Sequence, residues 1–264
     1  MSDTPPVSLV CCGLVGTVAI ERSLVDRTFA EAIATQGVVP GTEAYARAMV
    51  QVDRARGRTP IDVMNCLFAE DEARAQAANM AFERSFRAAL DRFGVTALPG
   101  ASEAVRQLSA SGIKVCLMSG MSQGCTRLVL SKIGWAHRVD LVLCADDVPR
   151  GCPWPDFVLT AVIRLGIEDV REVAVAGDTE NHVLSGRRAG AQIVAGLLTG
   201  GHTAGRLRTA GATHLLDSVA GLPDLVASGT GITTVPLNAA RLPSGSVPSQ
   251  GTAQASAQGR HAGL

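Results

Sequence analysis

The stretch LVCCGLVGT at residues 9–17 decides the fold that we expect for this chain. It continues an apolar run from Val7 to Cys12 and then changes to small residues, among them Gly13 and Thr17. A short apolar run bounded by glycine is typical of a strand that is buried in a parallel sheet. Ligands of such sheets bind outside the carboxyl ends of the strands, so these small residues are candidates for lining a site.

Four later runs repeat this pattern of a short apolar stretch followed by Gly, Ser or Asp and then by helical spacing. They are Lys114–Met118, Leu141–Cys144, Glu172–Ala176 and Gln192–Leu197. Alternating strands and helices favour a parallel sheet with helices on both faces. We therefore expect an α/β protein with a Rossmann-like parallel sheet core, whose polar strand ends converge on one crevice.

A helical block without strand signals separates the first strand from Pro99. Four stretches carry helical spacing of apolar residues: Ser23–Gln36, Thr42–Arg54, Pro60–Phe68 and Asp71–Phe93. Thr59 before Pro60 is typical of a helix cap followed by a first-turn proline. We expect an all-helical cap at residues 18–97, inserted after the first strand between core segments 1–17 and 98–228.

Composition limits the classes of function and predicts a tail. Residues 229–264 are rich in Gly, Ser, Ala, Gln and Pro without an apolar period, which predicts a disordered tail. The net charge of zero and 3% aromatic content argue against a nucleic-acid partner. No run approaches the ~20 apolar residues of a membrane span, and no signal pattern opens the chain, so we expect a cytoplasmic location.

The seven cysteines form an odd count without a C-x-x-C pair, which favours small, buried, reduced thiols. Cys11 and Cys12 should point to opposite faces of their strand and pack in the core. Only two of the 24 Lys and Arg residues are lysines, Lys114 and Lys132. That bias is typical of a bacterial genome rich in G and C.

The order of these segments resembles the haloacid dehalogenase superfamily, in particular its phosphonatase-like branch with a helical cap. The resemblance covers roughly residues 7–226. It rests on five strings in the right order: LVCCGLVGT at 9–17, MSG at 118–120, DDVPRGCPWPD at 146–156, VAGDTENH at 175–182, and LLTGGHT at 197–203 followed by THLLD at 213–217.

The resemblance implies that most catalytic positions are substituted. The family's nucleophilic aspartate falls at Gly13, so no covalent aspartyl intermediate can form there. The basic residue of the third motif falls at Cys152, and the second acid of the fourth motif at His182. Asp178 is retained, and Ser119 is retained as a phosphate-binding hydroxyl.

The same substitutions imply the loss of both metal and Schiff-base chemistry. Magnesium requires carboxylate oxygens, and the family supplies them from the nucleophile and two further acids, of which only Asp178 remains. We expect no metal and no cofactor. The cap lysine of true phosphonatases falls at Pro60, and neither Lys114 nor Lys132 lies in the cap, which excludes a Schiff base.

Two functions from different classes remain open. In one, the pocket is rebuilt as a metal-independent enzyme for a small organic metabolite in specialised biosynthesis, using acid–base or thiol chemistry at Asp178, His182 or Cys152. These three residues can also be read as a zinc site, or as residues that only pack and cap. The alternative is a catalytically inactive pseudoenzyme that binds a ligand or a protein partner.

Further residues are expected around the pocket, where loss of a carboxylate at Gly13 should enlarge the space. Arg58 and Arg150 are candidates for holding an anionic ligand. The family resemblance also implies a homodimer that pairs through the cap helices. The remaining pocket candidates are Cys12, Leu14, Val15, Thr17, Ser119, Gly120, Thr179 and Trp154.

Overall fold

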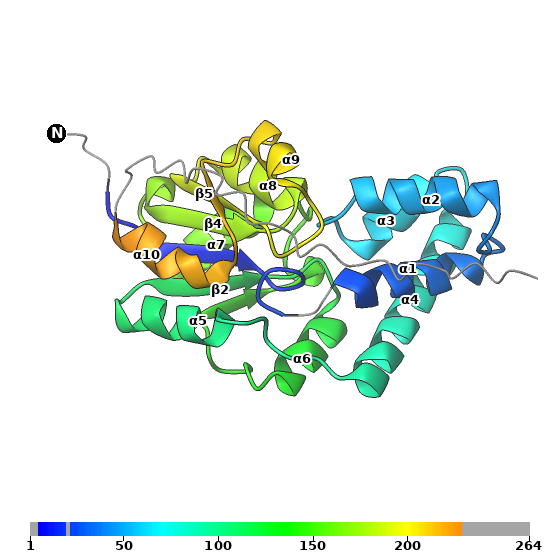
Figure 1. Ribbon diagram of the computed structural model, residues 1–264, viewed down its shortest axis with the longest axis horizontal. Coiled ribbons are helices and arrows are strands. Elements are labelled where there is room, and N and C mark those ends of the chain that lie inside the picture. The colour runs from blue at the N-terminus through cyan, green and yellow to red at the C-terminus, as the bar shows by residue number, and fades with distance from the viewer. Residues whose placement is uncertain (1–4, 20–21, 229–264) are drawn as a thin grey trace, which may run out of the picture. The chain divides into compact units, whose positions relative to one another are not determined.

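The computed structural model describes residues 5–19 and 22–228, and the predicted tail at 229–264 lies outside the described residues. Its centre is a six-stranded, wholly parallel sheet in the order β3-β2-β1-β4-β5-β6 (Figure 1). The strands are β1 (Leu9–Gly13), β2 (Lys114–Met118), β3 (Leu141–Leu143), β4 (Val173–Gly177), β5 (Ile193–Leu197) and β6 (His214–Leu216).

The strand order places a switch point beside β1. The chain leaves β1 towards β2 and β3, then returns to the other side of β1 with β4, where Leu9 pairs with Val173 and Cys12 with Ala176. The carboxyl ends of β1 and β4 therefore border the crevice that such sheets use for ligands. The predicted α/β, Rossmann-like sheet is confirmed.

The expected strands agree with the observed ones within two residues at either end, apart from one omission. β2 has the predicted bounds. β6 was not expected from the sequence, because its three residues are only half-buried at the edge of the sheet and Thr213 precedes them. An edge strand this short lacks the continuous apolar run by which the other strands are recognised.

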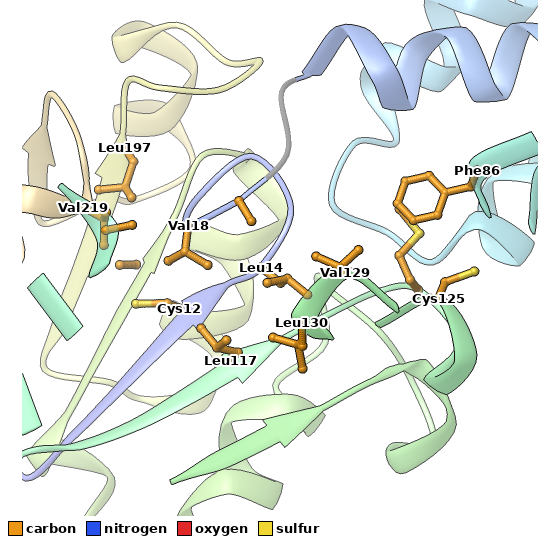
Figure 2. Close-up of a cluster of buried hydrophobic side chains, with 14 of the residues drawn as sticks. Cys12, Leu14, Val18, Phe86, Leu117, Cys125, Val129, Leu130, Leu197 and Val219 are labelled. Carbon is orange, nitrogen blue, oxygen red and sulfur yellow. The ribbon is translucent and has the colours of Figure 1, made fainter. Parts of the chain in front are cut away.

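Alternation along the strands divides the core into two apolar clusters, one on each face of the sheet. Cys12 and Leu117 belong to the first cluster, and Cys11 and Cys116 to the second, so the two neighbouring cysteines of β1 do face opposite ways. Figure 2 shows the first cluster extending from Cys12 and Leu117 on the sheet to Phe86.

Between β1 and β2 the chain forms α1 (Arg22–Ala34), α2 (Glu43–Arg54), α3 (Pro60–Leu67) and α4 (Glu72–Phe93), which Figure 1 shows as one group. Hydroxyl and carboxyl side chains cap three of them, and the Thr59 oxygen accepts from the Asp62 amide as the sequence predicted. Phe82 packs against Phe29 at 4.5 Å between ring centroids. These helices share the first apolar cluster with the sheet, so the limits of a separate cap at 18–97 stay a prediction.

The other helices cover the two faces of the sheet. Residues of α5, α6 and α10 belong to the first cluster, and residues of α7, α8 and α9 to the second. None of the helices in the described part of the chain is both long and apolar enough to span a membrane. The bounds are α5 (Ala101–Ala110), α6 (Gln123–Lys132), α7 (Asp156–Leu165), α8 (Glu180–Ala189), α9 (Ala204–Thr209) and α10 (Leu222–Ala227), with short 3-10 helices at Ala145–Asp147, Val170–Glu172 and Val219–Gly221.

Candidate functional site

Asp178 lies directly after β4 and is the most enclosed carboxylate at the crevice. It is 5% exposed, and its Oδ1 accepts a hydrogen bond of 3.1 Å from the Thr17 hydroxyl. Two glycines make this enclosure possible. A Cβ atom at Gly16 would lie 2.4 Å from Asp178 Oδ2, and one at Gly200 would lie 2.0 Å from the same oxygen. The backbone at these two glycines therefore packs directly against the carboxylate and shields it from bulk water.

His182 is held against Asp178 by the start of α8. Thr179 caps the helix, and its hydroxyl accepts from the His182 amide at 3.3 Å. The imidazole Nδ1 lies 3.4 Å from Asp178 Oδ1 and 3.1 Å from the Thr179 hydroxyl. The carboxylate and the hydroxyl thus fix the orientation of a ring that is 8% exposed.

The opposite edge of the imidazole lies over Gly13, at the end of β1. A Cβ atom at Gly13 would lie 2.9 Å from His182 Cε1, 3.1 Å from Nε2, and 2.8 Å from the Thr17 hydroxyl. The expectation of an enlarged cavity at Gly13 is therefore wrong. The imidazole occupies the space that a side chain at this strand end would need.

The electrostatics keep Asp178 ionised. Burial by itself raises the pKa of the carboxyl group, but the hydrogen bond and charge of His182 and the Thr17 hydroxyl together hold that pKa below its ordinary value. At neutral pH the group is therefore a carboxylate, and it favours the tautomer in which His182 Nδ1 carries a proton. Nε2 is the ring nitrogen on the edge that faces Gly13.

An inner cavity of about 90 Å³ adjoins this pair. Of the predicted residues, it is lined by Val15, Gly120, Thr179 and Arg58, together with Asp178 and His182 themselves. Sequence reasoning missed the walls that come from α1, from α2 and from the two residues after α2, since the sequence does not show whether a residue there faces a neighbouring helix or a cavity. These missed residues are Val25, Phe29, Val52, Ala55 and Arg56.

Other predicted pocket residues do not line this cavity. Cys12 and Leu14 pack in the first apolar cluster. The Ser119 hydroxyl is turned to Thr126, from which it accepts at 2.9 Å, and it also accepts from the Met121 amide. A serine at the end of a strand can hydrogen-bond either a ligand or its own loop, and the sequence does not show which of these it does.

Cys152 lies apart from the imidazole, in the wall of a different cleft. Its side chain belongs to the second apolar cluster, with Phe157 and Val183 as members. Burial raises the pKa of the thiol to about 12, although a hydrogen bond with Ser185 acts in the opposite direction. The thiol is therefore protonated at neutral pH, and the structure does not bring it together with His182 as an activated pair.

The residues at the crevice do not fit the magnesium ion that this type of fold implies. A magnesium site needs several hard oxygen ligands, but here one carboxylate faces an imidazole and a glycine. Asp178 is the one acid among the residues that line the inner cavity. Within residues 5–19 and 22–228, no three His, Cys, Asp or Glu side chains form a metal-binding group, which also leaves the zinc reading without support.

The two lysines lie away from the inner cavity. Lys114 Nζ donates to the Leu165 carbonyl at 2.7 Å, and Lys132 Nζ pairs with Asp91 of α4 at 2.9 Å. Pro60 lines the cavity instead, as the first residue of α3.

A polar network that the sequence did not reveal joins α2 to the start of α8. Arg206 pairs with Glu180 at 2.7 Å and with Asp53 at 3.1 Å. His202 is 3% exposed, and its Nδ1 accepts a hydrogen bond from the Glu180 amide. Its Nε2 lies 3.4 Å from the Asp53 carbonyl oxygen. Burial and the charge of Arg206 lower the pKa of His202. These residues lie far apart in the sequence, so no local sequence pattern indicates that they pair.

These features define a doubly wound α/β protein with its site at the switch point between β1 and β4. The family model described as haloacid dehalogenase-like hydrolase matches residues 7–190. The chain belongs to this family, and its relatives support the phosphonatase-like branch.

Curated relatives are phosphonoacetaldehyde hydrolases. The protein of Bordetella pertussis is 31% identical over 235 residues, which cover 70% of this chain and 82% of the relative. That of Pseudomonas fluorescens (strain Pf0-1) is 38% identical over 104 residues, or 39% of this chain and 38% of the relative. The chain thus matches little more than a third of the length of the latter.

Solved structures show the same fold at low identity. A phosphonoacetaldehyde hydrolase like protein from Oleispira antarctica has a TM-score of 0.74 with 20% identity, covering 85% of this chain and 93% of its own. A hydrolase from Pseudomonas syringae has a TM-score of 0.73 with 23% identity, covering 85% and 100%. These likenesses concern the fold alone.

Proposed function

We propose that this haloacid dehalogenase-like protein does not hydrolyse phosphoryl compounds and instead transfers protons on a small organic molecule. His182 is the acid–base group, and Asp178 orients it. One observation carries the proposal: the His182 imidazole stands in the space that a side chain at Gly13 would need, with Nδ1 turned to a buried carboxylate.

The phosphoryl route fails for lack of a nucleophile. Glycine at position 13 offers no oxygen to attack phosphorus, so the two-step route through a covalent intermediate has no first step. Cys152 is no substitute, because its thiol has a pKa of about 12 and packs among apolar side chains. The Asp178 carboxylate is engaged by Thr17 and His182.

Proton transfer needs only the groups that are present. With the Nδ1 proton held by Asp178, Nε2 takes a proton from an acidic C–H or O–H group of the substrate and returns it to another substrate atom. The carboxylate stabilises the imidazolium that exists between the two transfers. The net reaction is an isomerisation, a cyclisation or a ring opening, in which no atom is gained or lost.

The surroundings suit such chemistry. Apolar side chains of Val25, Phe29 and Val52 line the cavity and limit the access of water. In a poorly hydrated site the interaction between carboxylate and imidazole is stronger than in water. The substrate should be weakly charged at its reacting end.

Deuterium incorporation tests the proposal directly. Small carbonyl metabolites incubated with the protein in ²H₂O should gain deuterium next to the carbonyl, as followed by proton NMR. His182→Gln should slow that exchange about 100-fold or more, whereas the matched variant Cys152→Ala should leave it unchanged. Magnesium-dependent release of phosphate from phosphonoacetaldehyde by the wild-type protein would overturn the proposal.

The small size of the inner cavity favours the second candidate, an inactive protein that binds a ligand. Its volume of about 90 Å³ is below the ~300 Å³ at which pockets for small-molecule ligands usually begin. Ligand-induced stabilisation without deuterium exchange in any carbonyl compound would decide for this candidate.

A further inference from the structure

A second concavity adjoins the inner cavity on the other side of a short wall. This outer cleft has a volume of about 550 Å³ and lies between α3 and the loop at residues 145–154. The wall is the segment at residues 57–60. Arg58 is the one residue in the described part of the chain that lines both spaces.

The wall fits closely against the loops of the sheet. Gly57 has a φ of 82°, and a Cβ atom there would lie 2.4 Å from the Thr179 hydroxyl. A Cβ at Gly120 would lie 3.2 Å from the Arg58 carbonyl, and one at Gly151 would lie 2.6 Å from Thr59 Cγ2. These approaches fix the backbone of Arg58 at the border between the two spaces.

The three arginines of the outer cleft differ in their partners. Arg150 makes two hydrogen bonds to the Asp156 carboxylate, at 3.1 and 2.8 Å, and Arg188 donates to the Pro153 carbonyl at 2.9 Å. Arg58 has a single weak contact, in which its Nη1 lies 4.0 Å from Cys66 Sγ. Among residues 5–19 and 22–228, no carboxylate pairs with the Arg58 guanidinium.

The Trp154 side chain lines the same cleft as Arg58. Trp154 is 44% exposed, and Arg150 and Arg188 stack on its ring at 4.5 and 4.9 Å from the centroid. The acids in the cleft wall are Asp62 and Asp146, and Asp156 engages Arg150, so the three arginines of the cleft are balanced by three acids. An anion is therefore favoured by Arg58 alone, whose side chain has a single polar contact among the described residues, with Cys66, because a guanidinium fork binds the paired oxygens of a carboxylate or phosphate.

We propose that the outer cleft binds an oxyanion handle of the substrate, with Arg58 as its main ligand. The inner cavity, with room for only a small group, then receives the reacting end near His182. The link to catalysis rests on the proposed function, but binding of the handle does not. The substrate class that follows is a small carbonyl compound carrying a carboxylate or a phosphate ester at its far end.

Anion titrations followed by tryptophan fluorescence test this site. Inorganic phosphate and succinate are added separately, and the preferred anion distinguishes a phosphate from a carboxylate handle. Trp154 is half-exposed and Trp135 is buried, so Trp154 should report the binding, and Trp154→Phe should remove the signal. Because no turnover is measured, this result is independent of the deuterium exchange.

Variants then assign the ligand. Arg58→Ala should weaken binding of the preferred anion about tenfold or more, with partial recovery in Arg58→Lys. Arg150→Ala, in the same cleft but with its fork already engaged by Asp156, should change the affinity less than about threefold. No response to either anion, or equal losses in the two alanine variants, would overturn the proposal.

Discussion

The segments that follow β4 and β3 both bury polar side chains, but burial is accompanied by opposite shifts in their pKa values. Asp178 and His182 beyond β4 are 5% and 8% exposed, and Cys152 beyond β3 is 3% exposed. The pKa of Asp178 is lowered, because His182 and Thr17 surround it with polar partners. The pKa of Cys152 is raised, because apolar side chains surround it. The polar partners therefore keep Asp178 charged in spite of its burial, whereas burial among apolar side chains keeps the Cys152 thiol protonated.

The largest expected difference is in the cost of deleting each group. Asp178→Ala leaves the Thr17 hydroxyl without its buried acceptor and leaves His182 Nδ1 with the Thr179 hydroxyl alone, and should reduce the free energy of unfolding by about 3–5 kcal/mol. Cys152→Ala removes apolar contacts and a hydrogen bond with Ser185, and should cost about 1 kcal/mol. Urea denaturation at pH 7 measures both values. Equal costs would mean that the two loops do not differ as described.

A smaller effect should follow from filling the space over Gly13. Gly13→Ala puts a methyl group within 3 Å of His182 and Thr17, and should cost about 1–3 kcal/mol in the free energy of unfolding. The control is Gly205→Ala in α9, where the nearest atom lies 3.9 Å away and a neutral or slightly stabilising result is expected.

A double mutant separates this crowding from a backbone effect. In the His182→Ala background, Gly13→Ala should cost clearly less, since the imidazole that it meets is gone. If the cost is the same in both backgrounds, the imidazole does not occupy that space.

The smallest effect is a difference in pH dependence. The lowered pKa of Asp178 gives stability that is present above its unfolded pKa and is lost as the pH falls through the folded pKa. The raised pKa of Cys152 gives the reverse: stability is present below the unfolded pKa and is lost as the pH rises towards about 12. Asp178 thus limits stability at acidic pH, and Cys152 limits it at alkaline pH.

Chemical denaturation between pH 9 and pH 10 checks the alkaline side. Cys152→Ala should reduce the loss of unfolding free energy over this interval by about 1 kcal/mol relative to wild type. Few other groups except the remaining buried cysteines titrate there, because the sequence has one tyrosine and two lysines. An unchanged pH slope would show that the thiol ionises as freely in the folded protein as in the unfolded one.

The sequence predicts the sheet well because its signal is local. Buried parallel strands are short apolar runs, and β1, β2, β4 and β5 all consist of such runs. The predicted cap at Thr59 is a local signal too, and it lies where α3 begins.

The site was less predictable, because it depends on where side chains turn. A family motif places Cys152 and His182 in neighbouring loops, but the thiol packs among apolar side chains while the imidazole turns to Asp178. Arg58 and Arg150 are also the same letter in the sequence, although among the described residues a carboxylate engages only the second of them. Only their partners, Cys66 and Asp156, distinguish the two.

The contact between α2 and α8 depends on which nitrogen of His202 carries the proton. Its Nδ1 accepts a hydrogen bond from the Glu180 amide, so this nitrogen carries no proton. The N–H of the ring is therefore at Nε2, which faces the Asp53 carbonyl. Adding a second proton would turn the acceptor into a donor opposite another donor, with Arg206 paired to Glu180 nearby. A pH low enough to add this proton would therefore loosen the first turn of α8, next to Asp178.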